Sequence, residues 1–137
     1  MSEIIVGYDG TECSKAALDQ AVGLAKELGD KLVIAFGYAP PGYAGGEMKA
    51  HQDAIRERGA EITAEAARSA TEGGVENEVE LVPKRPAEAL SDLATQRRAR
   101  MIVIGSYGES PLKGAVLGST PHKLLHLSEA PVLVVRA

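Results

Sequence analysis

The sequence predicts an α/β fold, a five-stranded parallel sheet with helices on both faces, and three observations support it. Short apolar segments alternate along the chain with segments whose apolar residues recur at helical spacing. Glycine, proline or a hydroxyl residue stands at most junctions between the two kinds of segment. A glycine-rich stretch, residues 105–120, follows one apolar segment and leads into a new helix. Strands that alternate with helices form a parallel sheet covered on both faces.

The first predicted strand is 4–6, and it ends at the turn 7–10. Thr11 is placed to cap the helix that follows. Four apolar residues at helical spacing are expected on the inner face of this helix: Ala17, Ala21, Leu24 and Leu28. Gly29 then stands where the end of a helix favours glycine, and residues 32–36 form the second strand.

Proline and glycine exclude regular structure from residues 40–46, and a long helix is predicted for 47–71. Its expected inner stripe is narrow and consists of small or apolar residues: Ile55, Gly59, Ile62, Ala66 and Ala70. Gly73 and Gly74 end the helix. Residues 75–82 then alternate apolar with acidic side chains, as in a half-exposed edge strand.

Pro86 opens the third helix, with Ala87, Leu90 and Ala94 on its inner face. The fourth strand is 101–104, the last helix begins near Pro121, and residues 132–135 form the fifth strand. We predict the strand order 3-2-1-4-5. In that order strands one and four are neighbours whose outgoing connections leave toward opposite faces, and ligands of open α/β sheets bind in the crevice that this creates.

Length and composition restrict the class of protein. A chain of 137 residues suits one domain, residues 1–137, and a net charge of −4 argues against a general nucleic-acid binder. Cys13 is the only cysteine, which excludes an internal disulfide and a cysteine-rich metal site. The chain shows neither a signal segment nor an apolar run long enough to span a membrane, so we expect a cytoplasmic protein.

Residues 105–120 predict an anion-binding loop, because they join a strand to the start of a helix. Glycines allow close approach of the backbone, and the first N–H groups of a helix have no partner within it. The expected phosphate ligands are the amides and hydroxyls of Gly105, Gly108, Gly118, Ser119 and Thr120. The loop is not a Walker A motif, because no lysine stands between Gly118 and Ser119. Lys113 can reach a phosphate, although a solvated loop lysine is the simpler description.

Asp9 follows the first strand and would face this loop across the crevice. A carboxylate there can accept hydrogen bonds from ribose hydroxyls or hold Mg²⁺. Alternatively, Asp9 forms a turn with Gly10 or caps the first helix. Thr11 as the nearer cap slightly favours the ligand role.

Other candidate groups carry less information. Tyr107 can stack on a base or contact a phosphate, or it is simply a half-buried loop residue. His122 and His126 have the i, i+4 spacing that can share a metal, but no nearby Glu or Cys completes a ligand pattern, so the sequence does not predict a metal centre there. Cys13 is most simply a packing residue, and no Ser–His–Asp or Cys–His arrangement is supported.

Three segments together resemble the ATP-binding branch of the universal stress protein family. They are VGYDGTECSKAAL near the start, the spacing Gly105-x2-Gly108-x9-Gly118-Ser119, and the closing residues 130–135. The resemblance implies the adenine nucleotide alpha-hydrolase-like (Rossmann-like) fold, a homodimer that pairs residues 132–135, and a role in stress response without defined catalytic turnover. It also implies a regulatory protein partner, which the sequence does not identify.

The resemblance further implies where ATP, or AMP or cyclic AMP, would bind. Asp9 would lie near the ribose and could take part in binding Mg²⁺ with the nucleotide, and the backbone around Gly7 and Gly37 would lie near the adenine. The remaining site residues that it implies are Tyr8, Gly105, Ser106, Tyr107, Gly108, Gly118, Ser119 and Thr120.

Two departures from the family pattern bear on the ligand. Many relatives carry a basic residue or histidine where Tyr107 stands, and residues 82–86 lack a glycine common in relatives. Weaker polyphosphate binding, or preference for a monophosphate or cyclic nucleotide, is therefore a hypothesis. Slow ATP hydrolysis is an alternative function. A nucleotidyl transferase is disfavoured by the first loop, Tyr8-Asp9-Gly10-Thr11, and a dimerisation module with a disused pocket is disfavoured by the three retained glycines.

Overall fold

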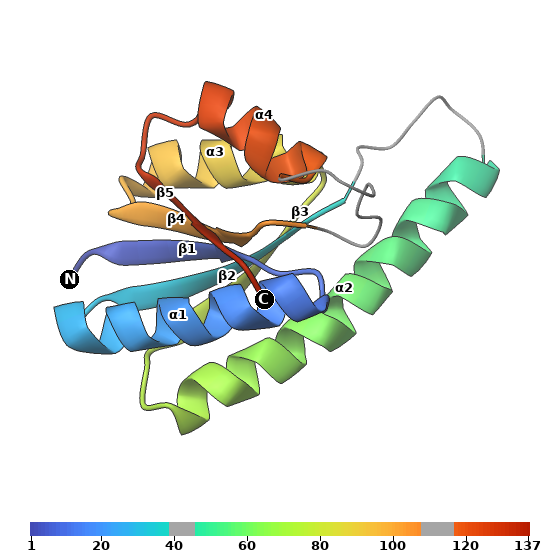
Figure 1. Cartoon of the computed structure of the whole chain (residues 1–137). Helices are drawn as coiled ribbons and strands as arrows, with labels where there is room; N and C mark the ends of the chain where they lie inside the picture. Colours follow the sequence, from blue (N-terminus) through green and yellow to red (C-terminus); the bar gives the residue numbers. More distant parts are fainter. Residues whose placement is uncertain (39–45, 108–116) are drawn as a thin grey trace.

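The computed structural model describes residues 1–38, 46–107 and 117–137. Its elements follow one another along the chain as strand, helix, strand and so on (Figure 1). They are β1 (Glu3–Gly7), α1 (Glu12–Leu28), β2 (Lys31–Gly37), α2 (Gly46–Glu72), β3 (Asn77–Val82), α3 (Pro86–Arg97), β4 (Met101–Gly105), α4 (Ser119–Leu127) and β5 (Val132–Val135).

The predicted topology is confirmed. The strands form one sheet in the order β3-β2-β1-β4-β5, and every pair of neighbours is parallel. β1 lies at the centre, in register with β2 from the pair Glu3–Lys31 to the pair Gly7–Ala35. β3 and β5 are the two edge strands. All residues of β3 are only partly buried, as its alternating sequence predicts.

Helices cover both faces of the sheet. α1 and α2 lie on one face and α3 and α4 on the other (Figure 1). Ile4, Val6 and Tyr8 of the central segment point toward α1 and α2, whereas Ile5 points toward α3. This alternation follows from the two-residue period of a strand, and it divides the core into two apolar layers.

Two predicted helix details differ from the structure. Leu28 is 43% exposed, so its expected place on the inner face of α1 is wrong; the buried side chains of α1 end at Ala25. The reason is the helix end: Gly29 adopts φ +71° and turns the chain toward β2, leaving the last turn uncovered. In addition, α4 begins at Ser119, which places Pro121 at its third residue.

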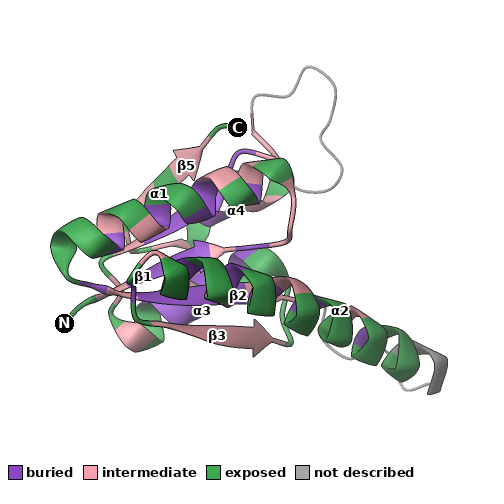
Figure 2. Cartoon of the chain, turned by 90° about the horizontal axis from the view of Figure 1, so that it is seen from below, coloured by how far each residue is buried: buried purple, intermediate pink, exposed green. Residues whose placement is uncertain are grey.

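The long helix α2 carries the predicted stripe, in which Gly59, Ala66 and Ala70 are buried and the two isoleucines are half-buried. Gly59 is needed for close packing, because a Cβ there would lie 2.4 Å from the ring of Phe36. The amino-terminal part of α2 extends beyond the sheet, where most of its surface is exposed (Figure 2). No helix of the described residues is long and apolar enough to cross a membrane.

Candidate functional site

A cleft lies where β1, β2 and β4 end at the carboxyl edge of the sheet. It encloses about 520 Å³ of space free of atoms, part of which is open to solvent. Backbone, apolar and small polar groups line it. The lining residues are Gly7, Tyr8, Asp9, Ser14, Ala35, Phe36, Gly37, Pro86, Leu90, Ile104, Gly105, Tyr107, Thr120 and Pro121.

Seven of the eleven predicted site residues lie together in this cleft. They are Gly7, Tyr8, Asp9, Gly37, Gly105, Tyr107 and Thr120. Gly118 and Ser119 belong to the start of α4, and Ser106 lies behind the lining, while Gly108 is outside the described residues. Lys113, considered as a phosphate contact, is also outside them.

Asp9 both forms a turn and lines the cleft, so the two roles considered for it coexist. Its Oδ1 accepts a hydrogen bond from the Thr11 N–H at 3.0 Å and another from the Thr11 hydroxyl at 2.6 Å. Thr11 in turn caps α1 by accepting from the Ser14 N–H, as predicted. No described residue bonds to Oδ2 of Asp9. The carboxylate therefore keeps one oxygen available to a ligand.

Ser14 is a cleft residue that the sequence analysis missed. It is 4% exposed, its hydroxyl donates to the Thr11 carbonyl at 3.0 Å, and it accepts from the Asp9 N–H at 3.4 Å. The only feature of the sequence that could have indicated Ser14 is its position three residues after the cap, and many helices have a polar residue there. Ser14 holds the Asp9 turn against the start of α1.

The wall formed by β2 and α3 was also missed, apart from Gly37. Pro86 and Leu90 of α3 and Ala35 and Phe36 of β2 line it. A Cβ on Gly37 would lie 2.8 Å from the Cα of Pro86, so glycine allows the start of α3 to approach the end of β2. This wall is made of apolar groups and main chain, a surface that suits a flat aromatic ring.

Packing gives Gly105 a reason to be glycine that is independent of the predicted phosphate contact. A Cβ at this position would lie 2.7 Å from the backbone carbon of Cys13, at the start of α1. In the described residues the glycines with positive φ are Gly10, Gly29 and Gly74. Gly105 is therefore not required for a left-handed backbone conformation. Close packing of α1 on β4 therefore accounts for Gly105, whether or not a phosphate also approaches it.

Ser106, directly after β4, is bonded to β5 and to Gly118. Its N–H donates to the Val135 carbonyl of β5 at 2.9 Å, and its own carbonyl accepts from the Gly118 N–H at 2.6 Å. Its hydroxyl lies 3.7 Å from the thiol of Cys13, and the residue is 2% exposed. Ser106 thus has a structural position beneath the site.

The bond between Ser106 and Gly118 bears on one detail of the predicted phosphate site. The Gly118 N–H, which is expected to bind phosphate, donates a hydrogen bond to the Ser106 carbonyl in this structure. Gly118 precedes α4 with φ −72° and no side chain caps the helix. Pro121 has no N–H, so the amides of Ser119 and Thr120 are those that the start of α4 presents.

The charges around the cleft are few. Asp9 is the only carboxylate among the described lining residues, and none of them is Lys or Arg. Burial raises the pKa of Tyr8, and Glu65, Asp9 and Asp19 raise it further, so the phenol stays protonated. Burial also acts to raise the pKa of Cys13, but hydrogen bonds from Ser106, Tyr107 and Ala137 outweigh it and lower the pKa.

Comparisons with known proteins agree with this geometry. The universal stress protein family model matches residues 1–136. Universal stress protein YxiE of Bacillus subtilis is 32% identical over 98% of this chain and 99% of its own. A universal stress protein solved in complex with cAMP is 31% identical with a TM-score of 0.76, covering 98% of this chain and 96% of that one.

A third protein is similar in fold alone. It is the universal stress protein of Archaeoglobus fulgidus solved in complex with dAMP, which is 20% identical with a TM-score of 0.75 and 98% of each chain covered. The strand order, the position of the cleft and the match along nearly the whole chain lead to one conclusion. This chain belongs to the universal stress protein family, with its adenine nucleotide alpha-hydrolase-like fold.

Proposed function

We propose that the protein binds an adenine nucleotide in the cleft and acts as a regulatory stress-response protein without defined catalytic turnover. The observation that carries the proposal is the arrangement of the two lips of the cleft. Asp9 offers a carboxylate oxygen on one lip, and Thr120, at the uncapped start of α4, stands on the other. The relative bound to cAMP, at 31% identity, supports the same class of ligand.

The geometry suggests how each part of a nucleotide would be held. The wall of Gly37, Pro86 and Leu90 would take the adenine ring, by apolar contact and through main-chain groups. Oδ2 of Asp9 would accept from the ribose hydroxyls. The amides of Ser119 and Thr120 and the Thr120 hydroxyl would bind a phosphate, favoured by about 0.3–1 kcal/mol from the helix dipole. The Gly118 amide could also bind the phosphate only if its hydrogen bond to the Ser106 carbonyl were broken.

ATP with Mg²⁺ is one candidate ligand. Mg²⁺ is commonly held by one or two carboxylates together with phosphate oxygens and water, and Asp9 can provide one carboxylate. In the described residues no group of three or more His, Cys, Asp or Glu could hold a metal ion. We propose that the ion enters together with the nucleotide, held by Asp9 and phosphate oxygens.

AMP or cyclic AMP is the second candidate, and a specific observation favours it. No described lining residue is Lys or Arg, and Tyr107 lines the cleft at the position where the family resemblance implies a basic residue or histidine. The smaller charge of a monophosphate needs less compensation than that of a triphosphate. Slow ATP hydrolysis is the remaining alternative.

We further propose a homodimer through β5, acting in the cytoplasm with a regulatory partner of unknown identity. β5 is an edge strand, and Leu133 on it is 38% exposed. An apolar strand at a sheet edge is protected when it pairs with another strand. Sedimentation of the wild type and of Leu133→Lys would test this dimer, with a shift to monomer expected for the variant.

The decisive test is the identity and affinity of the nucleotide. Protein purified without added nucleotide is denatured and any released nucleotide identified by mass, after which the emptied protein is titrated calorimetrically with ATP, AMP and cAMP. We expect one of them to bind in the micromolar range, which corresponds to roughly −8 kcal/mol. A preference for AMP or cAMP over ATP favours the second candidate, a sensor of AMP or cyclic AMP, and a preference for ATP favours the first. The absence of binding by all three at millimolar concentration contradicts the proposal.

A further inference from the structure

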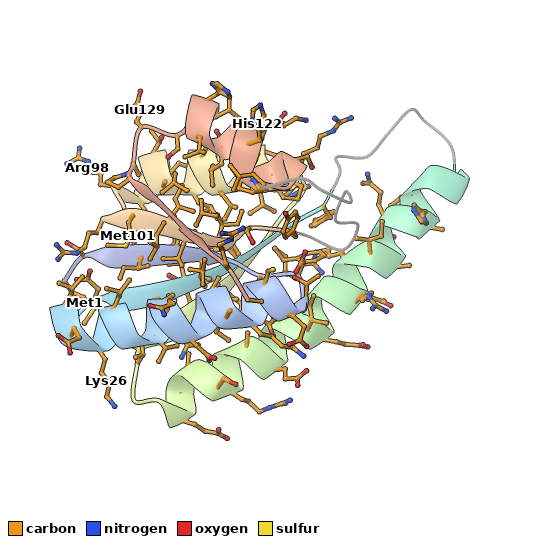
Figure 3. The ribbon with its side chains drawn as sticks, viewed as in Figure 1. Met1, Lys26, Arg98, Met101, His122 and Glu129 are labelled. Atoms are coloured by element: carbon orange, nitrogen blue, oxygen red, sulfur yellow. The ribbon has the colours of Figure 1, made fainter. Side chains whose placement is uncertain are left out.

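The outer face of α4 carries two histidines that the nucleotide site does not use. His122 and His126 are both exposed, and they are separated by one turn of the helix. The opposite face of α4 is buried through Pro121 and Leu124. Figure 3 shows His122 on the side of α4 that faces away from the sheet. The two imidazoles therefore lie next to each other and are open to solvent.

The separation of the two rings suits a shared metal ion. Their centroids are 5.1 Å apart and the ring planes meet at 74°. A metal–nitrogen bond of about 2.05 Å places an ion ~3.2 Å from the centre of each ring. With the centroids 5.1 Å apart, the angle at the ion is about 105°, close to the tetrahedral angle. The exposed rings need only turn about their side-chain torsions to aim one nitrogen each at that point.

We propose that His122 and His126 form a two-imidazole chelate for a borderline divalent transition metal ion such as Ni²⁺, Cu²⁺ or Zn²⁺. Imidazole nitrogen suits these ions, whereas Mg²⁺ and Ca²⁺ prefer oxygen ligands. No third His, Cys, Asp or Glu joins the pair within the part of the chain that the structure describes. Water fills the other coordination positions, so the ion exchanges readily and keeps sites open for other ligands.

Metal binding here has a structural consequence for α4. The helix has nine residues and no side-chain cap at its start, so its ends are expected to fray although Pro121 and Leu124 are buried and Ser91 donates to the Leu127 carbonyl. An ion that joins residues one turn apart stabilises the helical form against fraying. Thr120, at the start of the same helix, lines the cleft, so the chelate would also stiffen one lip of it.

The test uses untagged, nucleotide-free protein and Ni²⁺, which does not oxidise Cys13. Calorimetric titration of the wild type is compared with His122→Gln and His126→Gln, and we expect each variant to lose about tenfold or more in affinity, or ~1.4 kcal/mol. His51→Gln is the matched control, because His51 is a single exposed histidine on α2. It should bind as the wild type does, and Mg²⁺ should not compete.

A second control separates chelation from the mere number of histidines. The double variant His126→Gln/Leu127→His keeps three histidines but places two of them five residues apart, roughly 140° around the helix. Leu127 is 49% exposed, so the change should be tolerated. We expect this variant to bind as weakly as His126→Gln. Wild-type affinity in it, or an equal loss in His51→Gln, overturns the proposal, as does a wild type that fails to bind Ni²⁺.

Hydrogen exchange gives an independent readout. Ni²⁺ should slow exchange of the α4 amides by severalfold in the wild type and in His51→Gln, but not in His126→Gln. The two rings could instead form only an edge-to-face aromatic pair, which would stabilise α4 without any metal. In that case exchange in α4 would be independent of Ni²⁺ in every variant, and the proposal would be wrong.

Discussion

Two sets of carboxylates differ in how their charge is met: those bonded to Arg97 and Arg100, and Asp9 at the cleft. Arg97, in the last turn of α3, donates to Glu3 at 2.9 Å and to Glu78 and Glu80 at 2.6 Å each. Nearby, Arg100 donates to the buried Asp30 at 2.5 Å. At the carboxyl edge, Asp9 pairs with no described cation and its Oδ1 is bonded only to Thr11.

This difference separates a part that maintains the fold from a part that can bind. Carboxylates that are already matched to guanidinium groups have little to offer a ligand, and they tie α3 to β1 and β3. The carboxyl edge keeps an unmatched carboxylate oxygen and a helix start beside a cleft. The ion pairs of Arg97 and Arg100 thus hold elements of the fold together, whereas the cleft keeps a carboxylate without a described cation, and four variants probe the contrast.

The largest effect is expected for Gly105→Val. The new side chain would collide with the backbone of Cys13, because even a Cβ lies 2.7 Å from it, and α1 would have to move off β4. We expect the free energy of unfolding to fall by about 3 kcal/mol or more. Chemical denaturation measures it.

Gly23→Ala is the matched control for Gly105→Val. Gly23 lies on the exposed face of α1 with nothing within 4 Å of a Cβ, so alanine should stabilise by roughly 0.5–1 kcal/mol. If Gly105→Val were as stable as the wild type, the close packing of α1 on β4 would not be the reason for glycine, and its role would have to be sought at the ligand.

The next largest effect is expected for Arg97→Leu, which removes the guanidinium that joins three glutamates. Removing the guanidinium leaves Glu3, Glu78 and Glu80 facing one another without it, at side-chain exposures of 20–36%. We expect a loss of about 1–2 kcal/mol in the free energy of unfolding. Arg58→Leu, on the exposed surface of α2, should change it by less than ~0.5 kcal/mol. Equal effects of the two variants would mean that the ion pairs do not stabilise the fold.

The pH dependence of stability tests the contribution of the same ion pairs through Glu78. Hydrogen bonds from Arg97 and then Lys31 lower the pKa of Glu78 to about 2, against an ordinary 4.5. Because the folded pKa is the lower one, Glu78 stabilises the fold above pH 4.5, and this contribution is lost as the pH falls toward 2. Glu78→Gln should therefore be less stable than the wild type at pH 7, with the difference shrinking in acid. A difference independent of pH would contradict this.

The smallest effect on stability is expected for Asp9→Asn, at less than ~0.5 kcal/mol, because the amide oxygen can still accept from Thr11. Nucleotide affinity should nevertheless fall by about tenfold, since the charge and one strong acceptor are lost. Asp53→Asn, an exposed aspartate of α2, serves as the control and should keep full affinity. A stable Asp9→Asn protein with unchanged affinity would remove Asp9 from the binding site.

Much of the fold could be predicted because it depends on local patterns. The five strands, the capping of α1 by Thr11 and the opening of α3 by Pro86 all follow from short-range spacing and turn chemistry. The strand order was also predicted, and it follows from requiring that the glycine loop face the first strand. The prediction that Leu28 lies on the inner face of α1 was wrong, because periodicity does not show where a helix extends beyond the elements it packs against.

Of the cleft residues, the sequence predicts most of one side but only Gly37 on the wall formed by β2 and α3. Asp9, Gly105 and Thr120 are chemically conspicuous residues beside a strand end or a helix start, and the cleft contains them. The opposite wall consists of ordinary apolar residues such as Pro86 and Leu90, which nothing in a linear pattern distinguishes from core. The bond from Gly118 to the Ser106 carbonyl was likewise invisible, because it joins residues far apart along the chain.

What the sequence alone determined is the set of elements, their order and the chemical groups available at each junction, because these depend on neighbours within a few residues. Only the tertiary structure decided why Gly105 and Gly37 must be glycine, which residues face them across the cleft and which carboxylates are neutralised by arginine. Those answers depend on distances between segments that meet only when the sheet and its helices pack, and packing is a property of the whole chain.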